Sequence, residues 1–374
     1  MRDLLFLFLR LGATSFGGPA AHVAMLQEEV VRRRAWLTPE EFLDLLGAAN
    51  LIPGPNSTEL AMHIGWRRAG AAGLVVAGTS FILPAVAITA GFAWAYVRFG
   101  TVPALQGPLA GIRAAVLAVI GIAVWRLGRT AVKSRPLALM GVAVLAAALF
   151  GLSEVLLLFA GGVLGACWLA GFPRTGRRGG MLGMVPAGLL ALGTPPVEAA
   201  PALATLTTLG LFFLKVGSVL YGSGYVLIAF LQGGVVERYG WLSRAQLVDA
   251  VAAGQFTPGP VLSTATFVGY LVLGPAGSVV ATAAIFLPSF VFVALTAPHV
   301  DRFRKTPWMA AFLDSVNVAA LALMTAVTLQ LGRSTLTGPV AWGIALAGLL
   351  AALRWAVNPA WLVLGGALVG WLAG

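Results

Sequence analysis

The chain has 374 residues, of which 59% are hydrophobic and only 10% are charged. A soluble globular domain carries about 25% charged residues, so this chain cannot cover its surface with charged groups. The composition excludes a soluble protein and indicates one that is embedded in lipid.

The net charge is +11, from 24 basic and 13 acidic residues. The basic residues are dispersed between apolar segments, as expected when cytoplasmic loops collect arginine and lysine. They form no polar stripe, so we expect no nucleic-acid partner. The lipid bilayer is the partner that the composition predicts.

Metal and cofactor chemistry has little support in the sequence. The single cysteine, Cys167, excludes an internal disulfide and a cysteine cluster. His22, His63 and His299 lie far apart, without metal-binding spacing. We therefore expect no metal, no cofactor and no enzymatic activity. Arg10 interrupts the apolar N-terminal stretch, which we expect to be retained and not cleaved as a signal peptide.

The sequence pattern of the first half of the chain predicts helices and no strands. A short apolar helix ends at a glycine break, Ser15–Pro19, and a later helix begins at Thr38-Pro39-Glu40-Glu41. There Thr38 is the expected N-cap, Pro39 takes the first helical position, and Glu41 completes the capping box. The helices expected in chain order cover residues 4–14, 19–33, 38–52, 56–68, 71–97, 105–125, 137–150 and 153–172.

The triplet Pro53-Gly54-Pro55 breaks the helical pattern, and Pro258-Gly259-Pro260 does the same in the second half. Only about 15 residues lie on each side of the break, fewer than the ~20 that a full crossing needs. We expect discontinuous helices that meet inside the membrane, or a re-entrant hairpin. Irregular backbone at that depth is tolerated where it is buried in protein or lines a cavity.

The second half of the chain repeats the first, initially 205 positions later and beyond the triplet 204 positions later. Phe8–Gly12 matches Phe213–Gly217. Further matches are Gln27 with Gln232, Trp36 with Trp241, Asp44 with Asp249 and Gly54 with Gly259. We expect a first repeat at residues 1–178, a linker at 179–204 with room for a further span, and a second repeat at 205–374.

Charge placement predicts that the two repeats have inverted topology. The basic pair Arg67 and Arg68 matches Leu271 and Val272 in the second repeat. If basic loops face the cytoplasm, equivalent helices cross the membrane in opposite directions. The linker, near residues 181–192, would then cross once more.

These motifs resemble the chromate ion transporter family, in its long two-domain form. The resemblance rests on FLRLGATSFGGPAAH near the start and on the pair LIPGPNSTE and FTPGPVLST. It covers residues 4–135 and 209–333 and includes both helix breaks. Related proteins include short forms with a single repeat that act in pairs, which agrees with the duplication.

The resemblance implies a secondary transporter that exports chromate across the bacterial inner membrane, driven by the proton-motive force. Protons would be the coupling ion, and sulfate, a tetrahedral dianion of similar size, is the competing substrate. A sulfate or other oxyanion carrier is the alternative function, followed by a membrane scaffold. A membrane-embedded enzyme would need clustered histidines or carboxylates, which the sequence lacks. Homodimerisation stays open.

An oxyanion in an apolar interior needs several hydrogen-bond donors and compensating charge. A helix start after each triplet offers free N–H groups and a positive dipole end. The side-chain donors expected there are Asn56, Ser57, Thr58, Ser263 and Thr264. The alternative is that these residues cap only their own helices.

Two further groups of residues are candidates for the substrate site. Arg10 and Lys215 are lone cations at equivalent positions in apolar helices, where cations usually face a cavity or a partner. The alternative is that they extend to the membrane surface. The glycine break would add backbone amides at Gly17, Gly18, Gly222 and Ser223, or would serve only close helix packing.

Proton coupling requires a group that gains and loses a proton. Glu59 follows the first triplet, and its counterpart near Thr264 is uncharged; an ion pair with Arg10 would explain Glu59 equally well. Asp44 and Asp249 are equivalent in the repeat and are expected first to be structural. His22 can titrate near neutral pH, although a lone histidine is more often simply packed.

Overall fold

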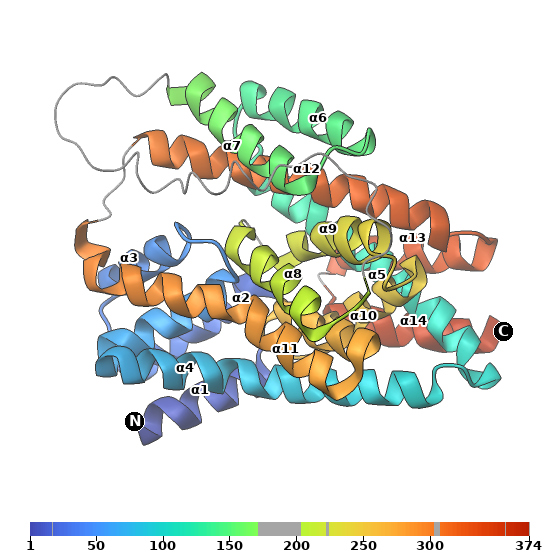
Figure 1. Ribbon diagram of the computed structural model, residues 1–374, viewed down its shortest axis with the longest axis horizontal. Coiled ribbons are helices and arrows are strands. Elements are labelled where there is room, and N and C mark those ends of the chain that lie inside the picture. The colour runs from blue at the N-terminus through green and yellow to red at the C-terminus, as the bar shows by residue number, and fades with distance from the viewer. Residues whose placement is uncertain (17, 171–202, 222–223, 303–306, 356, 374) are drawn as a thin grey trace.

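The computed structural model describes residues 1–16, 18–170, 203–221, 224–302, 307–355 and 357–373 (Figure 1). All regular elements in these ranges are helical, which confirms the predicted all-α architecture. The elements of the first repeat are α1 (Arg2–Thr14), α2 (Pro19–Gln27), the π-helix η1 (Glu28–Arg33), α3 (Pro39–Ala49), α4 (Asn56–Phe99), η2 (Pro103–Leu105), α5 (Gln106–Ala131), α6 (Arg135–Leu149) and α7 (Glu154–Ala170).

The second repeat has the same order of main helices, with two additional short 3-10 helices, η5 and η7. Its elements are α8 (Leu206–Val219), η5 (Gly224–Val226), α9 (Leu227–Leu231), the π-helix η6 (Gln232–Arg238), α10 (Arg244–Phe256), η7 (Val261–Ser263), α11 (Thr264–Thr296), η8 (Ala297–Arg302), α12 (Pro307–Thr335), α13 (Pro339–Trp355) and α14 (Pro359–Ala373). The predicted linker, residues 179–204, lies outside the described part of the chain except for its last two residues.

Four helical stretches in the described ranges are long and apolar enough to cross a membrane. They are Asn56–Phe99, Pro103–Ala131, Val261–Val300 and Trp308–Thr335. Their length and composition agree with the polytopic membrane protein that the composition predicts.

The longest helix of each repeat bends sharply near its start. Ala69 and Gly70 in α4 leave the helical conformation, and Leu273 and Gly274 do so in α11. Any side chain on Gly65 would collide with the carbonyl of Gly73, although residues eight apart in a straight helix are separated by about 12 Å. Each helix therefore folds back on itself, as the expected division between residues 56–68 and 71–97 predicts.

The two repeats interlock. The equivalent helices α4 and α11 pack against each other and run in opposite directions across the view in Figure 1. The equivalent helices α5 and α12 also pack together. The last two helices of each repeat are exchanged: α6 and α7 pack on α12, whereas α13 and α14 pack on α5. Each repeat thus completes the core of the other.

The helix before each triplet is fixed by a capping box. Thr38 accepts a hydrogen bond from the Glu41 N–H, and the Glu41 carboxylate accepts one from the Thr38 N–H. Ser243 and Gln246 make the same pair at α10. Such caps satisfy the free N–H groups of a helix start. The predicted helix start at Thr38 is confirmed.

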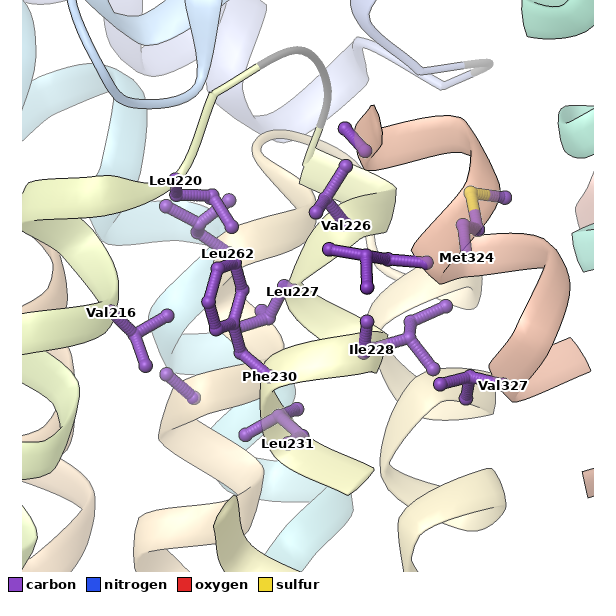
Figure 2. Packing of buried hydrophobic residues seen from close by; sticks show 14 of the residues in the cluster. Val216, Leu220, Val226, Leu227, Ile228, Phe230, Leu231, Leu262, Met324 and Val327 are labelled. Atoms are coloured by element: carbon purple, nitrogen blue, oxygen red, sulfur yellow. The ribbon is translucent and has the colours of Figure 1, made fainter. Parts of the chain in front are cut away.

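The core beside the second glycine break is apolar. In Figure 2 the side chains of Leu220, Leu262 and Phe230 point toward one another between α8, η7 and α9. Ile228 points toward α12, where Met324 lies. These residues are almost fully buried and form an apolar core beside the second glycine break.

Candidate functional site

Each Pro-Gly-Pro loop is hydrogen-bonded to the glycine break of the other repeat. The Gly259 N–H donates to the carbonyl oxygen of Ser15 at 2.9 Å, and the Gly54 N–H donates to that of Leu220 at 2.7 Å. The flanking prolines have no N–H, so each glycine supplies the only backbone donor in its triplet. We call these contacts the Ser15–Gly259 junction and the Leu220–Gly54 junction.

The backbone conformation explains why glycine occupies the centre of both triplets. The φ angle is 93° at Gly259 and 143° at Gly54, a region that side chains disfavour. Ser15 and Leu220 are themselves equivalent in the repeat. The two junctions are therefore related by the internal symmetry of the chain.

A small pocket lies at the Ser15–Gly259 junction, between the two repeats. Its lining residues are Ser15, Gly18, His22, Gly254, Gln255, Thr257, Gly259, Val261 and Pro359. Two buried donors in this lining, Ser15 Oγ and Gln255 Nε2, have no hydrogen-bond partner. Unpaired buried donors are costly, and their presence in a pocket points to a ligand that accepts hydrogen bonds. The lining contains no acidic residue.

The pocket is closed in this conformation. Its volume of about 10 Å³ holds roughly one water molecule. Nothing larger than a water molecule therefore fits in the pocket in this conformation.

The neighbours of His22 determine which of its nitrogens carries the proton. Nε2 lies 3.0 Å from the carbonyl oxygen of Ser15, and Nδ1 lies 3.2 Å from Ser57 Oγ. A carbonyl only accepts, so Nε2 is the donor, and Nδ1 of the neutral ring accepts from Ser57. His22 thereby connects the pocket to the start of α4.

Tyr225 extends the pocket's polar network toward a cation. Its hydroxyl donates to Gln255 Oε1 at 3.4 Å, which leaves the Gln255 amide N–H groups directed elsewhere. The charge of Arg126 acts on the same tyrosine. Arg126 is the basic side chain that these contacts link to the pocket.

The Leu220–Gly54 junction has the opposite polar character. Glu59 is completely buried, and its carboxylate lies directly on Gly54, where an added side chain would collide with it. Ser289 Oγ donates to Glu59 Oε1 at 3.1 Å, and Oε2 has no partner. The suggested ion pair between Glu59 and Arg10 is wrong, because Arg10 pairs with Glu29 instead.

The expected donors after the first triplet divide between the pocket and other contacts. Ser57 bonds His22, and the buried Thr58 Oγ1 has no partner. The amide of Asn56 donates to Asn50. Ser57 is therefore the member of this group that reaches a pocket residue.

The donors after the second triplet are engaged within the protein. Ser263 Oγ accepts from Thr89 at 3.2 Å, and Thr264 donates to the carbonyl oxygen of Val261 at 2.8 Å. Thr89 also donates to Thr257, a pocket residue. Ser263 thus supports the pocket wall through Thr89, and Thr264 serves its own helix.

The two predicted intramembrane cations lie outside the pocket. Arg10 is half exposed and paired with Glu29 on η1. Lys215 interacts with the charge of Glu154 on α7. Glu154 occupies the space that Gly233, without a side chain, leaves free. Lys215 of the second repeat therefore has a carboxylate of the first repeat near it. As substrate ligands, Arg10 and Lys215 stay predictions.

The glycine break and the two aspartates complete the predicted set. Gly18 lines the pocket; Gly17, Gly222 and Ser223 lie outside the described residues. Asp44 is exposed. Asp249 is 3% exposed and makes a bidentate ion pair with Arg113, with both N–O distances at 2.8 Å.

In the described ranges, no three histidine, cysteine or carboxylate side chains come together to hold a metal ion. Two repeats with broken helices that meet at a polar pocket between them are an arrangement found in membrane transporters.

Comparison with known proteins identifies the family. The chromate transporter family matches residues 2–166 and 207–371, one match in each repeat. The chain is 35% identical to a chromate transport protein of Cupriavidus metallidurans over all of this chain and 93% of that protein. It is 31% identical to a chromate transport protein of Pseudomonas aeruginosa, over 98% of this chain and 90% of that protein. The chain belongs to the chromate transporter family.

A shorter relative supports the repeat. An uncharacterized transporter of Bacillus subtilis is 25% identical over 42% of this chain and 90% of its own length, so it matches about one repeat. No solved structure matches the chain. Family members are transport proteins and not enzymes, and with the four long apolar helices this makes the chain a polytopic bacterial membrane protein.

Proposed function

We propose that this protein is a secondary transporter that exports chromate across the bacterial inner membrane, driven by the proton-motive force. The observation that carries the proposal is the pocket at the Ser15–Gly259 junction, where Ser15 Oγ and Gln255 Nε2 are buried donors without partners. Relatives along the whole chain are named chromate transport proteins. A scaffold would not need such a pocket.

The pocket's chemistry suits a tetrahedral dianion. Each chromate oxygen accepts hydrogen bonds, and the lining offers donors from both repeats without a carboxylate to repel the charge. Sulfate has the same shape and charge and is the competing substrate in the test.

The membrane potential supplies an outward force on such an anion. Moving one charge through 100 mV is worth about 2.3 kcal/mol, so a dianion gains about 4.6 kcal/mol on leaving a cell that is negative inside. Inverted repeats would let the junctions open toward either side in turn. The opposite directions of α4 and α11 in Figure 1 support that topology.

Uptake of radiolabelled chromate into inverted vesicles tests the function. We expect saturable uptake that a protonophore reduces; sulfate as competitor measures selectivity. Ser15→Ala removes the hydroxyl and keeps the carbonyl of the junction, and it should weaken uptake about tenfold, since a hydrogen bond to a charged group is worth about 1.5–3 kcal/mol. Thr14→Ala, at the exposed neighbour, is the matched control. Absence of saturable uptake by the wild type would reject the proposal.

A further inference from the structure

The two junctions share a backbone hydrogen bond but differ in every polar side chain around it. The pocket residues Ser15, His22 and Gln255 correspond to Leu220, Leu227 and Asn50 around the other junction. Leu220 and Leu227 are buried in the apolar core of Figure 2. The Leu220–Gly54 junction therefore cannot be a second copy of the anion pocket.

That junction holds a carboxyl group in place of donors. Glu59 is 0% exposed, and in the described part of the chain it makes no ion pair. Its Oε1 accepts from Ser289, a residue of the other repeat, and its Oε2 is buried without a partner. A buried carboxylate without a cation is costly, and an unpaired oxygen at an interface between repeats marks a place for a positive charge.

The internal symmetry indicates that the carboxyl group is not required for folding. At the Ser15–Gly259 junction, Gly259 faces Ala85, the counterpart of Ser289. At the 204-residue offset, the residue in the place of Glu59 is Ser263, which carries no carboxyl group and whose Oγ accepts from Thr89. The same backbone junction thus forms without a carboxyl group and with alanine in the place of Ser289, so Glu59 and Ser289 serve something other than the junction itself.

We propose that the Leu220–Gly54 junction is the coupling-ion site of the transporter, in which Glu59 binds and releases a proton while the Ser15–Gly259 junction binds the anion. This inference rests on the proposed function. The step is a simple acid–base transfer: an O–H bond forms at Glu59 Oε2 with a proton from water on one side, and breaks to water on the other.

Coupling follows from how the junctions are built. Each joins the glycine break of one repeat to the triplet of the other, so a displacement of one repeat against the other would act on both junctions. The titratable side chains around Glu59 are Tyr221, whose hydroxyl its charge affects from the second repeat, and His63, one turn further along α4 with both ring nitrogens unpartnered. Ser289, on α11, does not titrate.

Infrared difference spectroscopy on the purified full-length protein during a pH titration tests the assignment without any transport. We expect a protonated-carboxyl C=O band that titrates in the wild type and is lost in Glu59→Gln. Ser289→Ala should shift its midpoint, because it removes the hydrogen-bond donor to the carboxylate. Glu41→Gln, at an exposed carboxylate, is the matched control and should leave the band intact. A band that persists in Glu59→Gln would overturn the proposal.

A transport measurement links this proton to the anion. In proteoliposomes with an internal pH dye, wild type should move protons in the direction opposite to chromate. Glu59→Gln should lose the proton signal yet keep chromate-induced thermal stabilisation, because the anion junction is intact. If the infrared band behaves as expected but chromate neither stabilises the wild type nor moves protons, the proposed chromate transport is rejected and the assignment of the proton site to Glu59 is kept. If stability in wild type responds to Na⁺ at fixed pH, and Glu59→Gln removes that response, the proton assignment is wrong.

Discussion

The helices before the two triplets each carry an aspartate at the same place, and the two aspartates have different surroundings. Asp249 on α10 is buried against Arg113, and Tyr96 donates to it at 2.7 Å. Asp44 on α3 is exposed, and the counterpart of Arg113 is Asn317, which carries no charge. Equivalent elements have therefore kept their backbone and diverged in their side-chain contacts.

The difference shows which parts of the two repeats are tied together. The ion pair fastens α10 to α5 of the first repeat, and α10 packs on that helix. The equivalent helix α3 packs on α4 and on η8 instead. Both triplets follow a capped helix and form a junction. In this conformation the helix before the second triplet has, in addition, a charged contact with the other repeat.

The largest expected effect concerns this ion pair. Asp249→Ala leaves the charge of Arg113 without its partner and should destabilise the protein by about 3 kcal/mol, the lower end of the range for a broken buried pair, since Arg113 is 23% exposed. Thermal unfolding in detergent measures the change.

Asp44→Ala is the matched control at the equivalent position. An exposed substitution usually changes stability by no more than about 0.5 kcal/mol. Equal losses in the two variants would contradict the asymmetry between α3 and α10.

The second-largest expected effect, on chromate affinity, distinguishes the junction that binds the anion from the one that does not. Gln255→Leu removes an unpartnered donor from the pocket and should weaken chromate binding about 10-fold to 100-fold, at about 1.5–3 kcal/mol for a hydrogen bond to an anion. Asn50→Leu, the equivalent change in the other repeat, should leave the affinity within about twofold. Isothermal titration with chromate compares them, and equal affinity losses would place the anion elsewhere.

The smallest effect concerns the helix caps, where the repeats agree in geometry and differ in charge. Thr38→Ala and Ser243→Ala should each cost about 1 kcal/mol of stability. The hydrogen bond from the Thr38 N–H, and then that from Arg67, lower the pKa of Glu41. The contribution of the Glu41 carboxylate to the stability of the protein is therefore fully present above the ordinary pKa of a glutamate. It is lost as the pH falls through the lowered pKa of Glu41.

Gln246 in the second cap does not titrate. Acid should therefore diminish the effect of Glu41→Ala, which removes the carboxylate that accepts from the Thr38 N–H, and leave that of Gln246→Ala unchanged, as measured by thermal unfolding over a pH series. An equal pH dependence of the two variants would show that Glu41 does not take part in the first cap.

Features with a local cause could be predicted from the sequence. The capping box at Thr38, the breaks at the two triplets and the division of α4 near Gly70 depend on neighbours along the chain, and the duplication needs only a comparison of the chain with itself. Glu59 and His22 also stood out, because a charged or titratable side chain is rare in an apolar segment.

Contacts between the repeats could not be predicted. No local signal shows that Gly259 bonds Ser15 of the other repeat, or that Ser289 donates to Glu59. Gln255 was missed, although the mismatch between it and Asn50 within matching helices was a usable sign. Glu154 was also missed. The first repeat has glutamates at the places where the second has glycines, at 233 and 234, and these missing carboxylates were the only sequence signal that one is supplied from elsewhere.

The exchange of α6 and α7 for α13 and α14 has a consequence for how the protein can exist at all. Each repeat, made alone, would expose the long face of α5 or α12 that the other repeat's last helices cover. The molecule is in effect a dimer of unlike subunits joined in one polypeptide. Because the two subunits differ in sequence, one carries a carboxyl group, Glu59, at a place where the other has none.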